Sequence, residues 1–429
     1  MAVTNGNANG TVNGHGPSNG ATVPEVNPPI DIGIALRPCD SDAVPEILKN
    51  ISSFGKSPSL DNDNARLGLL AKARDLVRAL ETPRETMIKH CWAQPGCYTA
   101  ITSCYNLGVF SVLANDGGSS KRVTEIASTL KTNPEVLAMG YIKETGVDEY
   151  APTNFTKSLT IPIIGDGYPC LAGGAHESCS KFPEYMAKNN YATPTDVAAG
   201  PYQYAFNTTM NMFEYMQTHQ PLGTQFNHHM GGYSQGRPSW MDAGFYPIEE
   251  RLIGAVGGSD DTATLVDVGG SLGHDIAKFN KKYPNAPGRL ILQDLPVVIN
   301  AIQELDPKIK RMTHDFLTEQ PVKGARAYYM HSVLHDWPDH VCTNILKQLA
   351  GAMKPGFSKI LINENIIPDR DADWQATALD MMMITLFSSK ERTKSDWYRL
   401  LEAPEVGLKI VGIWSVDNGV ESLIECELK

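Results

Sequence analysis

A glycine-rich turn and an acidic residue in the second half of the chain are suited to hold a nucleotide-like cofactor. The segment Leu265–Gly273 (LVDVGGSLG) is typical of a strand that enters a tight turn, with a helix following from about His274. Gly269 and Gly270 let backbone approach a ligand closely, and the helix N-terminus attracts negative charge. Asp294 follows the next apolar run, where its carboxylate can accept both hydroxyls of a ribose. The glycine spacing differs from the GxGxxG dinucleotide pattern, so the two features together favour an adenosine-containing cofactor without a pyrophosphate.

A histidine and two acids could provide proton-transfer chemistry near that cofactor. His335 stands in the segment VLHDWPD, just after an apolar run, where open α/β sheets form their ligand crevices. By position alone, an equal alternative is a surface loop in which Asp336 or Asp339 caps the next helix. Glu364 and Glu391 favour the functional reading, because a carboxylate at strand-end depth is costly without a partner and imidazole is a natural one.

The composition excludes several other classes of protein. The 429 residues include 37 Lys and Arg against 48 Asp and Glu, giving a net charge of -11, so nucleic acid is an unfavourable partner. No apolar run reaches the roughly 18 residues that span a bilayer, and residues 1–29 lack the features of a signal peptide, so we expect a cytoplasmic protein. Eight scattered cysteines without a CxxC pair predict buried free thiols and no metal site.

The first part of the chain reads as a disordered tail followed by short helices. Residues 1–30 are rich in Asn, Gly, Pro and Ser, a composition that cannot offset the entropy of ordering. From Asp63 the apolar spacing predicts an amphipathic helix facing a core. Further helices are expected over Tyr98–Asn106 and from Asn133 to Gly146, and Val147–Thr153 is typical of a short edge strand.

These helices and strands suggest a winged-helix arrangement, which in regulators reads DNA. The candidate recognition helix, Pro134–Thr145, has one lysine and two glutamates, which is the wrong sign for phosphate contact. It more plausibly packs against protein, such as a second copy of the chain.

After Thr264, short apolar runs alternate with helical stretches, and this alternation is typical of a parallel sheet with βαβ connections. A helix is expected over Val341–Met353, and the chain should end in an antiparallel hairpin. Between about 155 and 250 the pattern is less clear, and a cluster of aromatic and methionine residues there is read as core rather than as a ligand wall. The cluster consists of Met210, Met212, Phe213, Phe226, Met230 and Trp240. The predicted parallel strands are residues 265–268, 289–293, 327–330 and 359–363. The predicted hairpin pairs residues 408–414 with residues 420–427.

At these residues the chain resembles the S-adenosylmethionine-dependent O-methyltransferases of the plant caffeate and flavonoid type and their fungal secondary-metabolite relatives. The resemblance covers nearly all of the chain after about residue 65, except the Gly-rich stretch near 163–180. The matching segments are Ala79–Pro83, Tyr105–Phe110, Leu265–Gly270, Asp294–Pro296, Leu334–Trp337 and Glu391–Thr393.

The resemblance implies an α/β fold with two parts. A Rossmann-like class I methyltransferase domain with a C-terminal antiparallel hairpin would be preceded by a helical, winged-helix-like domain that forms an intertwined homodimer. We therefore expect a disordered tail and linker over residues 1–60, the dimerisation domain over 61–165, and connecting helices with the catalytic domain over 166–429.

The resemblance also implies a cofactor site for S-adenosylmethionine. Gly269 and Gly270 would lie under its methionine part and Asp294 would hold its ribose. Asp315 and Phe316 would bracket the adenine. Two positions depart from the family pattern: Ser271 stands where plant members often have Gly, and His331 stands where many members place Lys or Arg near the cofactor.

For the acceptor side, the resemblance implies that His335 is the general base. Glu364 and Glu391 would orient its ring, and Asp336 would lie beside the acceptor. The acceptor pocket would be lined by Phe226, Met230 and Met383.

The sequence thus predicts an O-methyltransferase that acts on a phenolic or enolic hydroxyl of a small aromatic or polyketide-type metabolite, without a metal. The runner-up is a cofactor-bound cyclase, pericyclase or isomerase of the same fold, since the family contains such members; these have lost the catalytic histidine, whereas His335 is present. A non-catalytic regulator is disfavoured by the charge.

Overall fold

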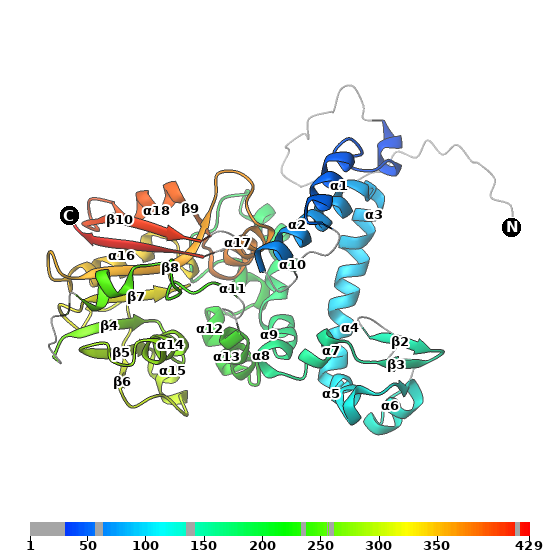
Figure 1. Ribbon diagram of the computed structural model, residues 1–429, viewed down its shortest axis with the longest axis horizontal. Helices are drawn as coiled ribbons and strands as arrows, with labels where there is room; N and C mark the ends of the chain where they lie inside the picture. The colour runs from blue at the N-terminus through cyan, green and yellow to red at the C-terminus, as the bar shows by residue number, and fades with distance from the viewer. Residues whose placement is uncertain are drawn as a thin grey trace.

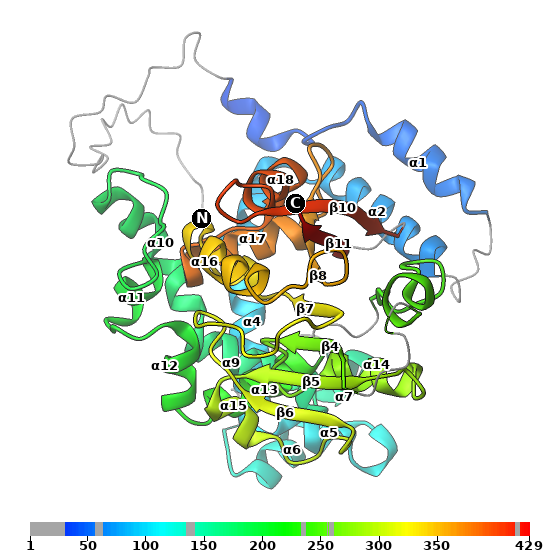
Figure 2. The same cartoon turned by 90° about the vertical axis from the view of Figure 1, so that its left-hand side faces the viewer.

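The computed structural model describes residues 31–55, 63–133, 142–232, 237–254, 256, 261–416 and 421–429. Its main feature is an eight-stranded mixed sheet in the order β10–β11–β8–β7–β4–β5–β6, with the short β9 paired to the end of β8. Strands β4 to β8 are mutually parallel, while β11 runs antiparallel to both β8 and β10. Figure 2 shows β7, β4, β5 and β6 side by side. The strands are β4 (Ala263–Val268), β5 (Arg289–Asp294), β6 (Ile309–Thr313), β7 (Ala327–His331), β8 (Lys359–Ile367), β9 (Arg392–Thr393), β10 (Leu408–Ser415) and β11 (Glu421–Leu428).

Helices cover both faces of this sheet, which is why its central strands are continuous apolar runs. Alternate residues of β4 serve two cores: Val266 and Val268 pack with α16 and α18, whereas Leu265 packs with α14. The carboxyl ends of β4, β5, β7 and β8 therefore meet at one edge, where the predicted site residues stand. The helices of this part are α14 (His274–Lys282), α15 (Pro296–Ala301), η6 (Leu334–Asp336), α16 (Asp339–Ala350), α17 (Trp374–Phe387) and α18 (Lys394–Leu401).

The N-terminal helices form an arm that stands apart from the sheet in Figure 1. Its long helix α4 has Pro95 in its first turn and ends at Gly108, whose φ of 82° suits the left-handed C-cap. A small sheet, β1–β3–β2, lies near the lower end of α4. The elements are η1 (Ile32–Leu36), α1 (Val44–Ser53), α2 (Asp63–Leu80), α3 (Pro83–Ile88), η2 (Lys89–Ala93), α4 (Gln94–Leu107), α5 (Val109–Ala114), η3 (Asp116–Gly118), β1 (Lys121–Arg122), α6 (Val123–Leu130), β2 (Lys143–Gly146), β3 (Glu149–Ala151) and α7 (Asn154–Ser158).

Connecting helices occupy the space between the arm and the sheet (Figure 1). They share a core with α17, in which Tyr202, Met212, Met216 and Leu386 are buried. This part includes the Gly-rich stretch near 163–180, which is helical. The helices are α8 (Pro162–Gly165), α9 (Gly167–Gly174), α10 (His176–Lys188), α11 (Pro201–Phe206), α12 (Met212–Thr218), α13 (Leu222–Gly232) and η5 (Glu249–Ile253).

Several sequence predictions for the N-terminal part are corrected. Most of the helix predicted from Asn133 to Gly146 lies outside the described residues, and its end, Lys143–Gly146, is strand β2. The predicted edge strand is instead central, because β3 pairs with both β1 and β2. The described part of region 1–60 contains helices η1 and α1, so it is not an unstructured linker throughout; the predicted tail, 1–30, lies outside the described residues.

The apolar stripe of α2 does not face a core within the chain. Ala79 is its one buried residue, while Leu67, Leu70, Val77 and Leu80 are 37–51% exposed. Helix α1 packs along α2, and Arg74 Cζ of α2 lies 4.8 Å from the ring centroid of Trp374 on α17, but these four apolar side chains keep a large exposed fraction within the single chain.

All eight cysteines lie in described parts of the chain and carry free thiols. Cys104, Cys170, Cys342 and Cys426 are buried as predicted, but Cys39 and Cys91 are exposed. Among the helices that the structure describes, none combines the length and apolarity required to cross a bilayer.

Candidate active site

The turn η6 carries His335 at the carboxyl edge of the sheet, directly after β7. One carboxylate holds this turn from the N–H side: Glu364 Oε1 accepts the backbone N–H groups of Val333, Leu334 and His335 at 3.0, 2.9 and 3.3 Å. Glu364 is fully buried at the corresponding position of β8. A buried carboxylate with three N–H donors is a strong local anchor, so the neighbouring strand fixes the backbone from which the imidazole projects.

The imidazole of His335 is held on one side by the two predicted acids. Its Nδ1 lies 2.8 Å from Glu391 Oε1 and 3.7 Å from Glu364 Oε2. On the other side, Nε2 lies 3.5 Å from Asp336 Oδ1. A carboxylate at Nδ1 selects the tautomer with the proton on Nδ1, which leaves Nε2 for the second proton-transfer partner. The structure thus brings His335, Glu364, Glu391 and Asp336 together as predicted.

The acids strengthen the basicity of this histidine. Burial alone would lower the pKa of His335, but the charges of Glu364 and Asp336 and the hydrogen-bonded Glu391 outweigh it and raise the pKa to about 10. Burial raises the pKa of Asp336 to about 7, with the His335 charge opposing the shift. Burial also raises the pKa of Glu364. A ring nitrogen of His335 and carboxylate oxygens of Glu364 and Glu391 lie within 4.8 Å of one another, which is close enough to bind a metal ion. The hydrogen bond from His335 Nδ1 to Glu391 explains this close spacing without a metal ion.

The glycine turn after β4 is built for close approach. Gly269 has a φ of 71°, and a Cβ on Gly270 would lie 2.5 Å from both Asp267 Cγ and Leu292 Cδ1. Ser271 adopts a φ of 53° and donates its backbone N–H to Asp294 Oδ2 at 2.8 Å. Asp294, at the end of β5, therefore anchors the turn as well as facing the same edge.

An acid that the sequence interpretation did not single out, Asp267, lies beneath this turn. It is 1% exposed, and its Oδ2 has no hydrogen-bond partner among the described residues. Burial raises its pKa well above the usual range, with Asp275 adding to the shift. Asp267 thus has a buried carboxylate oxygen that lacks a hydrogen-bond donor in the described part of the chain, and it lies beside a turn whose two glycines leave room for a ligand. A ligand with a donor or cationic group fits this place, and the amino-acid part of S-adenosylmethionine has such a group.

His331, at the end of β7, is enclosed by two acids. Its Nδ1 lies 2.5 Å from Asp275 Oδ2 and its Nε2 lies 3.3 Å from Glu421 Oε2. Arg237 pairs with the same Glu421 at 2.6 Å. Burial alone would lower the pKa of His331, but Asp275 and Glu421 raise it well above its usual value. The two acids therefore favour the charged form of His331.

The predicted adenine residues lie in the loop after β6. Asp315 Oδ1 accepts the N–H of Leu317 at 2.9 Å, which shapes the loop. The ring of Phe316 packs edge to face against Trp337, with the ring centroids 6.0 Å apart. A Cβ on Gly269 would lie 3.6 Å from the ring of Phe316. Phe316 therefore lies between the glycine turn and the segment that carries His335.

The predicted acceptor residues lie on α13 and α17, two helices that both contact α12. Phe226 and Met230 are four residues apart on α13 and share one face. Phe213 joins the helices, because its ring lies 5.9 Å from that of Phe226 and 5.3 Å from that of Phe387 on α17. Met383 is buried on α17. The predicted cluster is divided, since Met212 is buried with Phe213 and Phe226 whereas Trp240 belongs to the core under the sheet.

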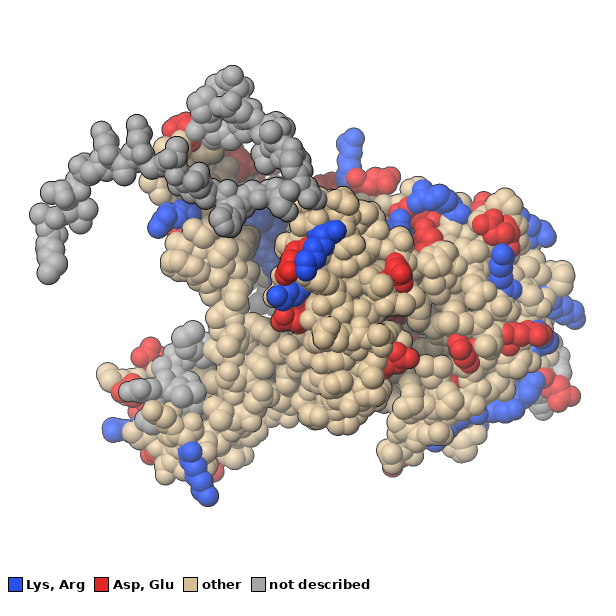
Figure 3. All heavy atoms as spheres, turned by 180° about the vertical axis from the view of Figure 1, so that it is seen from behind, with Lys and Arg blue, Asp and Glu red and all other residues tan. Residues whose placement is uncertain are grey.

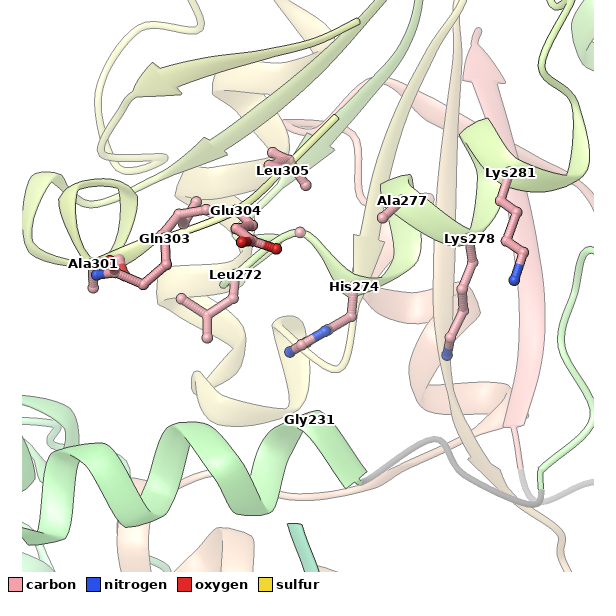
Figure 4. Close-up of a pocket in the computed structure, with 12 residues that line it drawn as sticks. Gly231, Leu272, His274, Ala277, Lys278, Lys281, Ala301, Gln303, Glu304 and Leu305 are labelled. Carbon is pink, nitrogen blue, oxygen red and sulfur yellow. The ribbon is translucent and has the colours of Figure 1, made fainter. Parts of the chain in front are cut away.

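A hollow of about 550 Å³ lies beside this site rather than in it. Figure 4 shows it between the end of α13, the first turns of α14 and the loop before β6, with His274 directed toward Gly231. None of the predicted site residues lines it, although Gly231 follows Met230 directly. We assign it no part in the chemistry.

Comparisons with known proteins agree with this geometry. An O-methyltransferase domain family matches residues 194–405. The chain is 32% identical over 390 residues to the O-methyltransferase mfmE of Annulohypoxylon moriforme, covering 89% of this chain and 95% of that protein. It is 33% identical over 393 residues to the O-methyltransferase mpaG of Penicillium brevicompactum, covering 89% and 98%.

Among solved structures, LepI in complex with S-adenosylmethionine matches with a TM-score of 0.79 and 26% identity, over 90% of this chain and 98% of that one. OxaC matches with a TM-score of 0.79 and 27% identity, over 90% and 99%. Relatives above 30% identity span nine-tenths of the chain, and the residues at the sheet edge fit the cofactor. The chain therefore belongs to the S-adenosylmethionine-dependent O-methyltransferases, in their fungal secondary-metabolite branch.

Proposed function

We propose that His335 is the general base that removes the proton of a phenolic or enolic hydroxyl during methyl transfer. The observation that carries this proposal is the hydrogen bond from His335 Nδ1 to Glu391, supported by Glu364, which leaves Nε2 as the atom that accepts the proton. Glu364 and Glu391 orient the ring and stabilise the imidazolium that forms. Asp336, 3.5 Å from Nε2, stands beside the acceptor oxygen.

The raised basicity of His335 suits a phenol. Bound S-adenosylmethionine supplies a methyl group on a sulfonium centre. A phenol has a pKa of about 10, so it is largely protonated at neutral pH and a poor nucleophile. Because the pKa of His335 is raised to about 10, the proton passes between groups of similar basicity. The remaining acceleration comes from holding the acceptor oxygen in line with the methyl carbon in a dry pocket.

We assign the cofactor contacts to the turn and loops at the sheet edge. Gly269 and Gly270 lie under the methionine part, and Asp294 accepts the ribose hydroxyls. Asp315 and Phe316 bracket the adenine. His331 supplies positive charge near the amino-acid part; its enclosure by Asp275 and Glu421 supports a fixed cation there.

The acceptor is a flat, largely apolar aromatic or polyketide-type molecule. Phe226, Met230 and Met383 would contact it, which is supported by the contacts of Phe213 on α12 with aromatic rings of both α13 and α17. OxaC, a structural relative, has been solved in complex with sinefungin and meleagrin and with oxaline, so a protein of this fold binds small molecules of that kind.

The winged-helix-like N-terminal part makes the protein a homodimer. The exposed apolar residues of α2, with Met87 and Trp92 in the following helices, support this because a solvated stripe of this kind needs a partner. On the face shown in Figure 3, few charged side chains lie over the connecting helices, while charges gather over the sheet part. Uncharged surface is favoured at dimer interfaces.

A cyclase or pericyclase is the second candidate. It is favoured by one observation: a structural relative at a TM-score of 0.79 is described as a pericyclic reaction enzyme. In that case the cofactor would be bound without being consumed. The His335, Glu364 and Glu391 arrangement supports methyl transfer more directly, because it has an evident use for a hydroxyl proton.

One assay separates the two candidates. The protein is incubated with methyl-labelled S-adenosylmethionine and a panel of phenolic and polyketide acceptors, and label transfer, S-adenosylhomocysteine and isomeric products are followed. We expect label transfer that collapses in His335→Ala while cofactor binding is retained. Tight cofactor binding with acceptors isomerised and no S-adenosylhomocysteine formed would establish the cyclase instead.

A further inference from the structure

The turn that carries His335 is held from a second side by a buried arginine, Arg392 on β9. Its Nη1 donates to Leu334 O at 2.8 Å and its Nη2 donates to Trp337 O at 2.8 Å. These two carbonyls flank His335 and Asp336. The guanidinium therefore binds the C=O groups of the same turn whose N–H groups bind Glu364.

The two charges match the polarity of the turn. Aligned peptide units place partial positive charge at their N–H end and partial negative charge at their C=O end. Glu364 supplies a carboxylate at the first end and Arg392 supplies a guanidinium at the second. Each charge–dipole contact is a charge-assisted hydrogen bond, which is about twice as strong as a neutral one.

Further contacts hold the guanidinium group of Arg392 in place. Its Nε donates to Asp339 Oδ1 at 2.9 Å, and Nη2 lies 3.3 Å from Cys342 Sγ. The ring of Trp397 lies 5.3 Å from its central carbon. Arg392 is 0% exposed, so water does not compete for its donors. Lysine cannot reproduce this planar fork.

Arg392 also adjoins Glu391 in sequence. One dipeptide therefore fixes both the imidazole, through Glu391 and Nδ1, and the backbone from which that imidazole projects, through Arg392. We propose that Arg392 is a positioning residue for methyl transfer, which sets the direction of His335 Nε2 by clamping the carbonyls of Leu334 and Trp337. The proposal deepens the proposed function and rests on His335 as the base.

The test compares Arg392→Lys with two further variants of the full-length protein. Arg399→Lys is the matched control, because Arg399 is exposed and its partner is Asp396. Asp339→Asn replaces the charged partner of Arg392 by a neutral one at a partly exposed side chain, and so weakens the clamp in a variant that keeps the arginine. Three readouts are measured: cofactor affinity by calorimetry, kcat against pH, and the ¹⁵N NMR titration of His335, assigned by its loss in His335→Gln.

For Arg392→Lys we expect a cofactor Kd within about twofold of the parent and a kcat lower by about 10- to 100-fold, the cost of a misplacement near 1 Å. The His335 titration and the pH limb of kcat should move together. Asp339→Asn should show the same changes with smaller size, and Arg399→Lys none.

The inference is overturned if folded Arg392→Lys keeps the parental kcat and His335 titration. It is also overturned if kcat falls equally at every pH while the titration is unmoved, because that result describes a structural role. If Arg392→Lys fails to bind cofactor or to fold, parental kcat and titration in Asp339→Asn overturn it. The proposed function fails separately: it is wrong if His335→Gln keeps full activity, whatever Arg392→Lys does to the titration.

Discussion

At the scale of single residues, the account depends on the environment of one imidazole. Three carboxylates surround His335, and their charges outweigh the effect of burial on its pKa. A base of this strength is effective toward phenols, but it must first lose its own proton. Its pH dependence is therefore a direct consequence of the geometry.

The first prediction concerns that pH dependence. With the pKa of His335 raised to about 10, the neutral imidazole that can accept a proton is the minor form below this value, so kcat/KM should rise with pH from neutral toward alkaline conditions. Asp336→Asn removes a charge that raises this pKa, so the limb should shift to lower pH. The same acceptor is used throughout, so that ionisation of the acceptor cancels in the comparison. Glu405→Gln, an exposed acid elsewhere, serves as the control. An identical limb in Asp336→Asn would count against the assignment.

The second prediction concerns the glycine turn. A Cβ at position 270 would lie 2.5 Å from Asp267 Cγ, so Gly270→Ala must displace the buried acid or the turn. We expect cofactor affinity to fall by more than about tenfold, which is about 1.4 kcal/mol, as measured by calorimetry. Gly146→Ala, where the nearest atom would be 3.6 Å away, should bind as the parent does. Unchanged affinity in Gly270→Ala would refute the close approach of cofactor to this turn.

At the scale of elements, sequence patterns predicted the buried strands well and the exposed ones poorly. β4, β7 and β8 are apolar runs covered on both faces, so composition alone reveals them. β6, with the sequence IKRMT, lies at the sheet edge and is mostly exposed, so it carries no such signal. Lys143–Gly146 is likewise exposed along its whole length and was merged with a helix.

The same reasoning applies to the site. His335, Glu364 and Asp294 could be predicted because each stands where an apolar run ends. Arg392 belongs to a segment that matches the family but has no evident role without its contacts, which reach back 58 residues to Leu334. The pairing of His331 with Glu421 likewise depends on β11 returning beside β8, which no local pattern reveals.

The third prediction concerns a junction between elements. Asp166, between α8 and α9, accepts Tyr105 Oη from α4 at 2.6 Å and contacts His228 Nδ1 from α13 at 2.6 Å. It thereby links the arm to the helix of Phe226 and Met230. Tyr105→Phe should lower the free energy of unfolding by about 1 kcal/mol in urea titrations. Tyr191→Phe, on a side chain that is mostly exposed, should change nothing. Equal stability of Tyr105→Phe and the parent would show that this link contributes little.

At the scale of the whole molecule, the chain consists of a covered sheet, a layer of connecting helices and an arm (Figure 1), in which the apolar stripe of α2 is partly exposed. The first two parts bury their apolar faces within the chain. The part of the arm from α4 to α7 does so too, around Leu113 and Ile126, whereas α2 keeps much of its apolar face exposed although its periodicity predicted a helix facing a core. The apolar periodicity of a helix indicates that one of its faces is covered, but it does not indicate whether the same chain or a second chain covers that face.

The fourth prediction is that this stripe holds the dimer. Val77→Asp combined with Leu80→Asp, at two side chains that are each 51% exposed, should convert a dimer to a monomer in light-scattering measurements without loss of helical content. Lys281→Glu, a charge change on α14, should leave the mass unchanged. A monomeric parent, or a dimer that survives the double substitution, would contradict the assignment.

The most direct test of the central claim compares the parent with His335→Ala across phenolic acceptors of graded acidity. A base is needed for weakly acidic phenols and dispensable for phenols that are already ionised. The account predicts that the loss in kcat/KM is about 10²- to 10⁴-fold for the former and shrinks steadily as the acceptor pKa falls below the assay pH. An equal loss for every acceptor, or no loss for any, would show that His335 does not remove the hydroxyl proton.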